Sequence, residues 1–248
     1  MMLRNKTAIL TGCNKGIGKA ILETFAENGA NVIACVRKSS GEFEKYIQDV
    51  REKFQVSIIV FSFDLEDSDQ IKKATASIIA LKVKIDILVN NAGIASGSFF
   101  HMTSITDLER MLKINFISQI QFTQAISRYM MKHKSGSIIN IASTAGLIGD
   151  EGMLSYGSSK AALIFSTKTI ANELGKYNIR VNSVAPSVTK TDMFEQMEVN
   201  ARNKLINSSV LKRAAEPQEI ANVVLFLASD MSSFVNAQII RVDGGIIA

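Results

Sequence analysis

The strongest constraint on the fold is a regular alternation of short apolar runs with longer segments of helical pattern. The runs are rich in Ile, Val and Ala, and they lie at residues 6–10, 31–36, 57–63, 85–89, 137–142, 179–184 and 238–242. Each connecting segment is long enough for the crossover helix that parallel neighbours require. Runs that are apolar at nearly every position are typical of strands covered on both faces. The sequence therefore predicts a doubly wound α/β fold, in which a parallel sheet of about seven strands carries helices on both faces.

Residues 1–248 are expected to form a single domain. The alternation runs without a linker, a low-complexity stretch or an internal repeat, and the hydrophobic content of 47% suits a large core. Residues 105–132 read as one long helical stretch that contains Asn115. Pro186 is expected to end the sixth strand. Residues 191–210 are polar and carry methionines, which favours a lid.

Composition excludes several classes of function. The net charge of +5 permits an anionic ligand, but the basic residues are scattered and Trp is absent, so nucleic acid is not an expected partner. Two cysteines, Cys13 and Cys35, make neither a disulfide framework nor a zinc site, and no metal is expected. The N-terminus shows no signal-like pattern, and no uninterrupted apolar run reaches the ~18 residues of a membrane span. We therefore expect a cytoplasmic protein without a membrane segment.

A glycine-rich turn follows the first apolar run directly. TGCNKGIG occupies residues 11–18, and a helical pattern begins immediately after it. Glycines let a backbone approach a ligand closely, and a helix N-terminus presents free N–H groups and positive potential. The turn therefore predicts a phosphate site, although glycines in a turn are weak evidence by themselves.

Tyr156 and Lys160 are four residues apart in a predicted helix over 155–175, so they share one face. A phenol with an ordinary pKa of about 10 is a poor acid–base catalyst at neutral pH, and an ammonium group one turn away lowers that pKa. Ser143 ends an apolar run, and its hydroxyl is suited to bind a substrate oxygen beside the phenol. The pair alone favours an ordinary surface contact, because this spacing is common by chance.

Eight segments together resemble the short-chain dehydrogenase/reductases over essentially the whole chain. They are TGCNKGIG at 11–18, DL at 64–65, NNAG at 90–93, Asn115, Ser143, YGSSK at 156–160, APSVTKTDM at 185–193 and RVDGG at 241–245. The C-terminal region is most similar to bacterial 3-oxoacyl-carrier-protein reductases. The resemblance implies a Rossmann-type fold, a nicotinamide cofactor and a catalytic tetrad of Asn115, Ser143, Tyr156 and Lys160. Cofactor contacts are expected at Gly12, Asn14, Lys15, Gly16, Ile17, Gly18, Arg37, Lys38, Asp64, Leu65, Asn91, Ala92, Gly93, Tyr156, Lys160, Pro186, Val188 and Thr191, and those of Lys15, Arg37 and Lys38 are inferred from their charge.

The resemblance also assigns a role to each member of the tetrad. Tyr156 protonates the oxygen of a ketone while the cofactor delivers hydride to its carbon, and Ser143 polarises that carbonyl. Lys160 lowers the pKa of the phenol and binds the nicotinamide ribose. Asn115 holds a water that re-protonates the site, although the sequence alone favours a satisfied amide within a helix. Ser187 departs from the pattern, because this turn usually carries glycine after its proline.

The expected function is therefore reduction of a ketone to a secondary alcohol, with 3-oxoacyl-carrier-protein reduction as one candidate. A dehydrogenase of another alcohol, sugar or cyclic ketone is the alternative, and a regulator that binds cofactor without catalysis is a third. Positive charge at residues 132–134 suits an acidic carrier protein, but Tyr177 stands where many such reductases have arginine. A homo-oligomer, usually a tetramer in this family, is expected from surplus apolar residues on two long helices: Ile117, Ile120, Phe122, Leu163, Phe165 and Ile170.

Cofactor choice depends on the end of the second strand. An acidic residue there binds both ribose hydroxyls of NAD and repels a 2′-phosphate. That position is Val36, and the next two residues are Arg37 and Lys38. Lys15 in the glycine turn is expected to project toward the same ribose. Cations without a carboxylate favour the additional phosphate, so the sequence predicts NADP(H).

Overall fold

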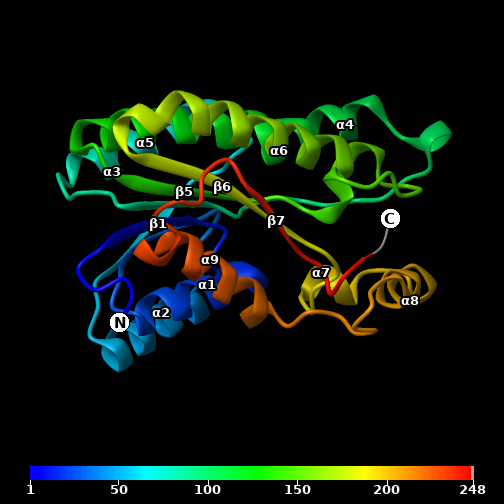
Figure 1. The fold of residues 1–248 in the computed structure, drawn as a ribbon, viewed down its shortest axis with the longest axis horizontal. Coiled ribbons are helices and arrows are strands. Elements are labelled where there is room, and N and C mark those ends of the chain that lie inside the picture. The colour runs from blue at the N-terminus through cyan, green and yellow to red at the C-terminus, as the bar shows by residue number, and fades with distance from the viewer. Residues whose placement is uncertain (247–248) are drawn as a thin grey trace.

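The computed structural model describes residues 1–246, which form one sheet between two layers of helices (Figure 1). Neighbouring strands are all parallel, in the order β3-β2-β1-β4-β5-β6-β7. The strands are β1 (Thr7–Thr11), β2 (Asn31–Val36), β3 (Ile58–Ser62), β4 (Ile87–Asn90), β5 (Gly136–Ile141), β6 (Ile179–Pro186) and β7 (Ile239–Val242). The predicted doubly wound fold is confirmed. The chain changes direction across the sheet between β1 and β4, and such a switch point opens a ligand crevice at the carboxyl ends of the strands.

Nine α-helices occur within residues 1–246, and most of them cover the sheet. They are α1 (Gly16–Glu27), α2 (Gly41–Phe54), α3 (Ser68–Ala80), α4 (Ile105–Leu112), α5 (Ser118–His133), α6 (Leu154–Leu174), α7 (Asp192–Glu195), α8 (Val199–Ser208) and α9 (Pro217–Ala228). In Figure 1, α1, α2 and α9 lie on one face of the sheet, whereas α3, α5 and α6 lie on the other. The short helices α7 and α8 stand apart, in the segment predicted to form a lid.

Successive residues of one strand feed two separate cores, which explains the continuous apolar runs. Leu10 of β1 packs in the core that contains Phe25 of α1. Its neighbour Ile9 packs in the opposite core, with Phe122 and Ile126 of α5. A polar residue at either strand position would be buried, because both faces of the sheet are covered.

Pro186 does not end the sixth strand as predicted, since β6 continues through it and pairs it with Val242. The backbone N–H groups of Ser183 and Ser187 donate toward β7, to the carbonyls of Gln238 and Val242. Pro186 is one residue out of phase, so its missing N–H faces the side of β5, and β5 has already ended at Ile141. The proline therefore costs the ladder no hydrogen bond.

The helical stretch predicted over 105–132 is not continuous. α4 ends at Leu112, and a π-helical turn, η2 (Lys113–Ile117), joins it to α5. Asn115 lies within this turn, and its side chain bonds the backbone of Ile94. Such turns are rare and occur frequently at functional sites. Separately, no helix within residues 1–246 combines the length and apolarity needed to cross a bilayer.

Candidate active site

The glycine turn lies against the end of β4 so closely that only glycine fits at two positions. A Cβ on Gly12, which has a φ of +68°, would lie 2.8 Å from Cα of Ala92. A Cβ on Gly18 would clash with the carbonyl oxygen of Gly12 and lie 2.6 Å from Nδ2 of Asn91. Asn91 fixes the turn by donating to the carbonyls of Thr11 and Gly12, both at 2.9 Å. In this structure the Asn91 side chain holds the turn in place, and its contact with a cofactor stays a prediction.

The N-terminus of α1 has the properties of an anion site. Its N-cap residue, Lys15, makes no capping bond with its side chain, and no acidic residue occupies the first turn. Free N–H groups and an uncompensated helix dipole attract a phosphate. Gly16 has a φ of +52°, Ile17 is half-buried, and Asn14 is exposed beside them. These residues stay the predicted place for the pyrophosphate of a dinucleotide.

Lys15 does not project freely toward the ribose site as expected. Its ammonium group lies 3.0 Å from a carboxylate oxygen of Asp192 at the start of α7. In addition, a Cβ on Gly16 would lie 3.0 Å from Cγ2 of Thr191. The lid segment therefore touches the glycine turn directly, and the cation is shared between them.

The expected adenosine end of the site is formed by the turns after β2 and β3. Val36 is buried and carries no charge, whereas Arg37 and Lys38 are exposed. The backbone N–H of Phe63 donates to the carbonyl of Val36 at 3.0 Å, so Asp64 and Leu65 lie next to Arg37. An uncharged residue therefore stands where a carboxylate would read an unphosphorylated ribose, and two cationic side chains follow it.

Asn115 is buried, and its amide is fully engaged with protein. Its oxygen accepts from the N–H of Ile94 at 2.9 Å, and its nitrogen donates to the Ile94 carbonyl at 2.8 Å and to the Ser159 hydroxyl at 3.0 Å. A Cβ on Gly93 would lie 3.0 Å from the Asn115 oxygen and 3.5 Å from the ammonium of Lys160. The structure thus brings Gly93, Asn115 and Lys160 together. The Asn115 side chain acts here as a clamp, and its predicted water is a separate hypothesis.

Tyr156 and Lys160 come from the first turns of α6, with Ser143 facing them from the end of β5. The Ser143 hydroxyl lowers the pKa of Tyr156, but burial has the larger effect and raises that pKa above its usual value. Lys160 is only 4% exposed, and burial lowers its pKa to about 8. Its ammonium donates to the carbonyl of Ile141 at 2.8 Å and lies 5.8 Å from the centre of the Tyr156 ring.

The sequence predicted that Lys160 lowers the pKa of the Tyr156 phenol, and the structure does not show this effect. The ammonium is engaged by Ile141 and is itself desolvated, so burial dominates for both groups. Tyr156 is therefore protonated at neutral pH, as a phenol with an ordinary pKa also is. A neutral phenol is the form that donates a proton to a carbonyl oxygen.

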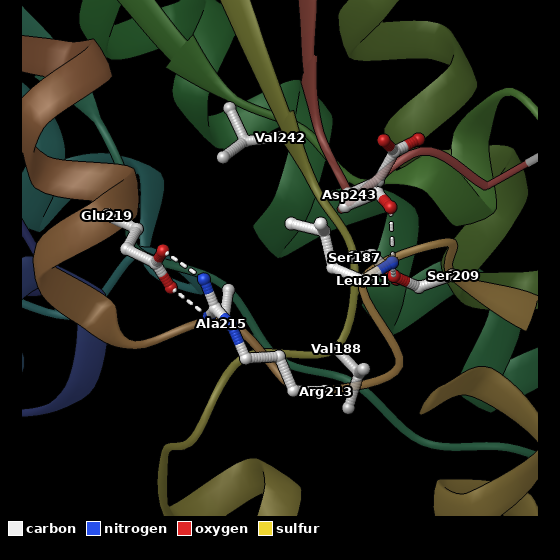
Figure 2. Close-up of a pocket in the computed structure, with 10 residues that line it drawn as sticks. Ser187, Val188, Ser209, Leu211, Arg213, Ala215, Glu219, Val242 and Asp243 are labelled. Atoms are coloured by element: carbon white, nitrogen blue, oxygen red, sulfur yellow. Dashed lines mark hydrogen bonds and ion pairs between the residues drawn. The ribbon is translucent and has the colours of Figure 1, made fainter. Parts of the chain in front are cut away.

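The turn after Pro186 borders a cavity of about 100 Å³ (Figure 2). The buried hydroxyl of Ser187 has no hydrogen-bond partner there, while its carbonyl accepts from Thr189 at 3.0 Å. Figure 2 shows Arg213 and Glu219 joined by two bonds, of 2.6 and 2.7 Å, at the edge of this cavity. Val188 also lines it, so the serine that replaces the usual glycine adds a polar group behind the predicted nicotinamide contact.

Two residues that support the site were not expected from the sequence. Thr11 accepts the N–H groups of Asn91 and Ala92, both at 3.0 Å, and so joins β4 to the glycine turn. Ser159 donates to the Tyr156 carbonyl at 2.7 Å and accepts from Asn115. The position of Thr11 directly before Gly12 could have indicated its role from the sequence. The role of Ser159 depends on the fold, and no local sequence pattern indicates it.

The class defined by this fold and this arrangement is a dinucleotide-dependent oxidoreductase, and comparisons with known proteins specify it. A family model described as enoyl-(acyl carrier protein) reductase matches residues 12–247. The 3-oxoacyl-[acyl-carrier-protein] reductase FabG of Thermotoga maritima is 37% identical over 247 residues, covering 100% of both chains. The 3α-hydroxysteroid dehydrogenase of Mediterraneibacter gnavus is 37% identical over 248 residues, covering 98% of each chain. The chain belongs to the short-chain dehydrogenase/reductase family.

A solved structure agrees with this assignment. A 7α-hydroxysteroid dehydrogenase complexed with NADH and 7-oxo glycochenodeoxycholic acid superimposes with a TM-score of 0.91 at 32% identity, covering 99% of this chain and 95% of that one. The chain is therefore an oxidoreductase that uses a nicotinamide cofactor, as the sequence predicted.

Proposed function

We propose that the protein reduces a ketone to a secondary alcohol with Tyr156 as the proton donor. The observation that carries this proposal is the grouping of three side chains. The Ser143 hydroxyl is hydrogen-bonded to Tyr156, and the Lys160 ammonium lies 5.8 Å from the centre of the Tyr156 ring. Ser143 hydrogen-bonds the substrate carbonyl and orients it toward the phenol. Lys160 supplies positive charge next to the oxygen that receives the proton, and Asn115 fixes the wall of the site through Ile94.

The cofactor proposed is NADPH, which supplies the hydride when bound. The glycine turn and the N-terminus of α1 would hold its pyrophosphate, and Arg37 and Lys38 would bind the 2′-phosphate. Asp64, Leu65 and residues 91–93 would line the adenosine, and Val188 and Thr191 the nicotinamide. A charge-assisted hydrogen bond contributes roughly 1.5–3 kcal/mol, so one contact with the phosphate gives a preference of about tenfold or more.

The substrate class proposed first is a 3-oxoacyl thioester, because the FabG reductases are among the full-length relatives. A bulky apolar ketone is the second candidate. The surface of the lid (residues 191–210) favours it over an acidic carrier protein, because that surface offers few unpaired cations. The cations in the lid and directly before it are paired with acids: Lys190 with Glu216, Arg202 with Glu195, and Lys204 with Glu151. Large apolar side chains around the lid and the loop after β4 are exposed: Phe99, Phe100, Met102, Met193 and Val199.

The basic residues considered for carrier-protein binding do not line this cleft. Lys132, His133 and Lys134 precede β5, whereas Ser143 follows it. A strand rises about 3.3 Å per residue, so the two positions are roughly 20 Å apart along β5. A carrier protein that contacted them would have to present its thioester across the length of β5 to reach Tyr156 of the same chain.

The test is loss of absorbance at 340 nm with NADPH or NADH and three carbonyl classes: acetoacetyl thioesters, decalones and steroid ketones. The proposal predicts turnover of at least one class and a higher kcat/KM with NADPH. Arg37→Ala should lower the ratio of kcat/KM for NADPH over NADH by about tenfold. Equal values for the two cofactors in the wild type would refute the proposed cofactor choice. Absence of turnover across all three classes would refute these substrate assignments.

A further inference from the structure

A carboxylate lies beside the cation expected to bind the 2′-phosphate. The turn after β3 runs next to the turn after β2, because the N–H of Phe63 donates to the Val36 carbonyl at 3.0 Å. The N–H of Glu66 donates to the Asp64 side chain at 2.8 Å, which fixes Glu66 in that turn. Arg37 is close enough to lower the pKa of the Glu66 carboxyl, although Arg110 has the larger effect. A free Glu66 would therefore compete with a phosphate for Arg37.

Arg110 reaches this carboxylate from the last turn of α4. Its Nε lies 2.7 Å from Oε1 of Glu66, and its Nη2 lies 2.9 Å from Oε2. Both carboxylate oxygens are thus engaged in a two-bond geometry, the strongest arrangement for this kind of pair. Within residues 1–246, the ion pair of Glu66 is with Arg110 and not with Arg37.

We propose that Arg110 is a positioning residue for cofactor choice, which holds Glu66 away from Arg37 and so leaves Arg37 free for the 2′-phosphate. This inference rests on the proposed function, in which Arg37 binds that phosphate. The carboxylates of Asp107 and Asp64 also interact electrostatically with Arg110, but its hydrogen bonds are to Glu66. The segment from α4 to α5 anchors the same turn twice more, through Lys113 to Ser68 and through Ser118 to Leu65.

The consequence is a selective loss of affinity. In Arg110→Gln, Glu66 is released to pair with Arg37, and binding of a ribose 2′-phosphate weakens by about fivefold, the upper range for a partly exposed ion pair. Binding of an adenosine without that phosphate should stay unchanged. Glu66→Gln in the Arg110→Gln background removes the competitor and restores the loss. If Arg110 instead acted through its own charge, the double variant would stay weak.

The experiment is calorimetry at low salt with two probes, adenosine 2′,5′-bisphosphate and 5′-AMP, so no catalysis is needed. The variants are Arg110→Gln, Glu66→Gln and their combination, and Lys72→Gln is the matched control because Lys72 forms an exposed pair with Asp69 at 2.9 Å. Thermal melting checks the fold of each variant, and Arg110→Met, which also removes the ion pair with Glu66, replaces Arg110→Gln if the latter does not fold.

The expected result is a preference for the bisphosphate that falls about fivefold in Arg110→Gln, returns in the double variant and is unchanged in Lys72→Gln. An unchanged preference in Arg110→Gln, or no recovery in the double variant, would overturn the inference. A wild type that binds both probes equally would instead refute the proposed role of Arg37, so the two failures are distinguishable.

Discussion

Gly18→Ala is expected to damage both the fold and the cofactor site. The new Cβ would clash with the Gly12 carbonyl oxygen and lie 2.6 Å from Nδ2 of Asn91. Neither neighbour can withdraw easily, because the Gly12 carbonyl is backbone and Asn91 is bonded to it at 2.9 Å. Overpacking of this kind costs about 1–3 kcal/mol, and loss of the Asn91 bond adds about 1 kcal/mol. The free energy of unfolding should therefore fall by roughly 2–4 kcal/mol.

Gly41→Ala is the matched control, since a Cβ there meets nothing within 4 Å and α2 begins at this residue. Alanine at that position should leave stability unchanged or raise it by up to about 1 kcal/mol. Urea unfolding measures both variants, and NADPH fluorescence measures cofactor binding. If Gly18→Ala unfolded within about 0.5 kcal/mol of the wild type and bound NADPH equally well, the close packing described for this turn would be wrong.

Two further variants test the buried lysine and the exposed helix face. Burial lowers the pKa of Lys160 from 10.5 to about 8, so the charged side chain destabilises the folded state below pH 8. This loss of folding free energy is about 3 kcal/mol, and it disappears as the pH rises from 8 to 10.5. Lys160→Met should therefore unfold with a higher free energy than the wild type at pH 7, and this advantage should shrink above pH 8; a less stable Met variant would contradict it. Phe165 is 73% exposed on α6, and we propose that it lies in a subunit interface. Phe165→Glu should therefore lower the mass of the protein measured by light scattering. A wild type that is monomeric in this measurement would exclude the interface.

Strand positions were predictable because burial on two faces leaves a continuous apolar signal. β2 was predicted with the same bounds that it has, and other strands differ by one or two residues. Pro186 was misread because the sequence does not reveal which neighbour its backbone faces. The six apolar residues proposed for an interface show the same limit in part. Phe122 and Leu163 are buried in the chain's own core, Ile120 and Ile170 are half-buried, and Ile117 and Phe165 are exposed.

The site was predictable at positions where chemistry requires one residue type. The glycines of the turn and the pair of Tyr156 and Lys160 belong to this group, because backbone approach and proton transfer tolerate few alternatives. The pairing of Lys15 with Asp192 and of Arg110 with Glu66 depends on segments far apart in sequence, so no local pattern indicates it. The direction of the Tyr156 pKa shift likewise depends on burial, which the spacing of two residues does not report.

The central claim is that Tyr156 donates the proton during hydride transfer, and Tyr156→Phe tests it most directly. The phenyl ring keeps the packing on α6 and removes the transferable proton. With NADPH and the best carbonyl substrate, kcat at 340 nm should fall by about 10²- to 10⁴-fold, the usual contribution of a general acid, while the Kd for NADPH stays within about threefold of the wild type. A variant that kept more than about a tenth of the wild-type kcat would contradict the account.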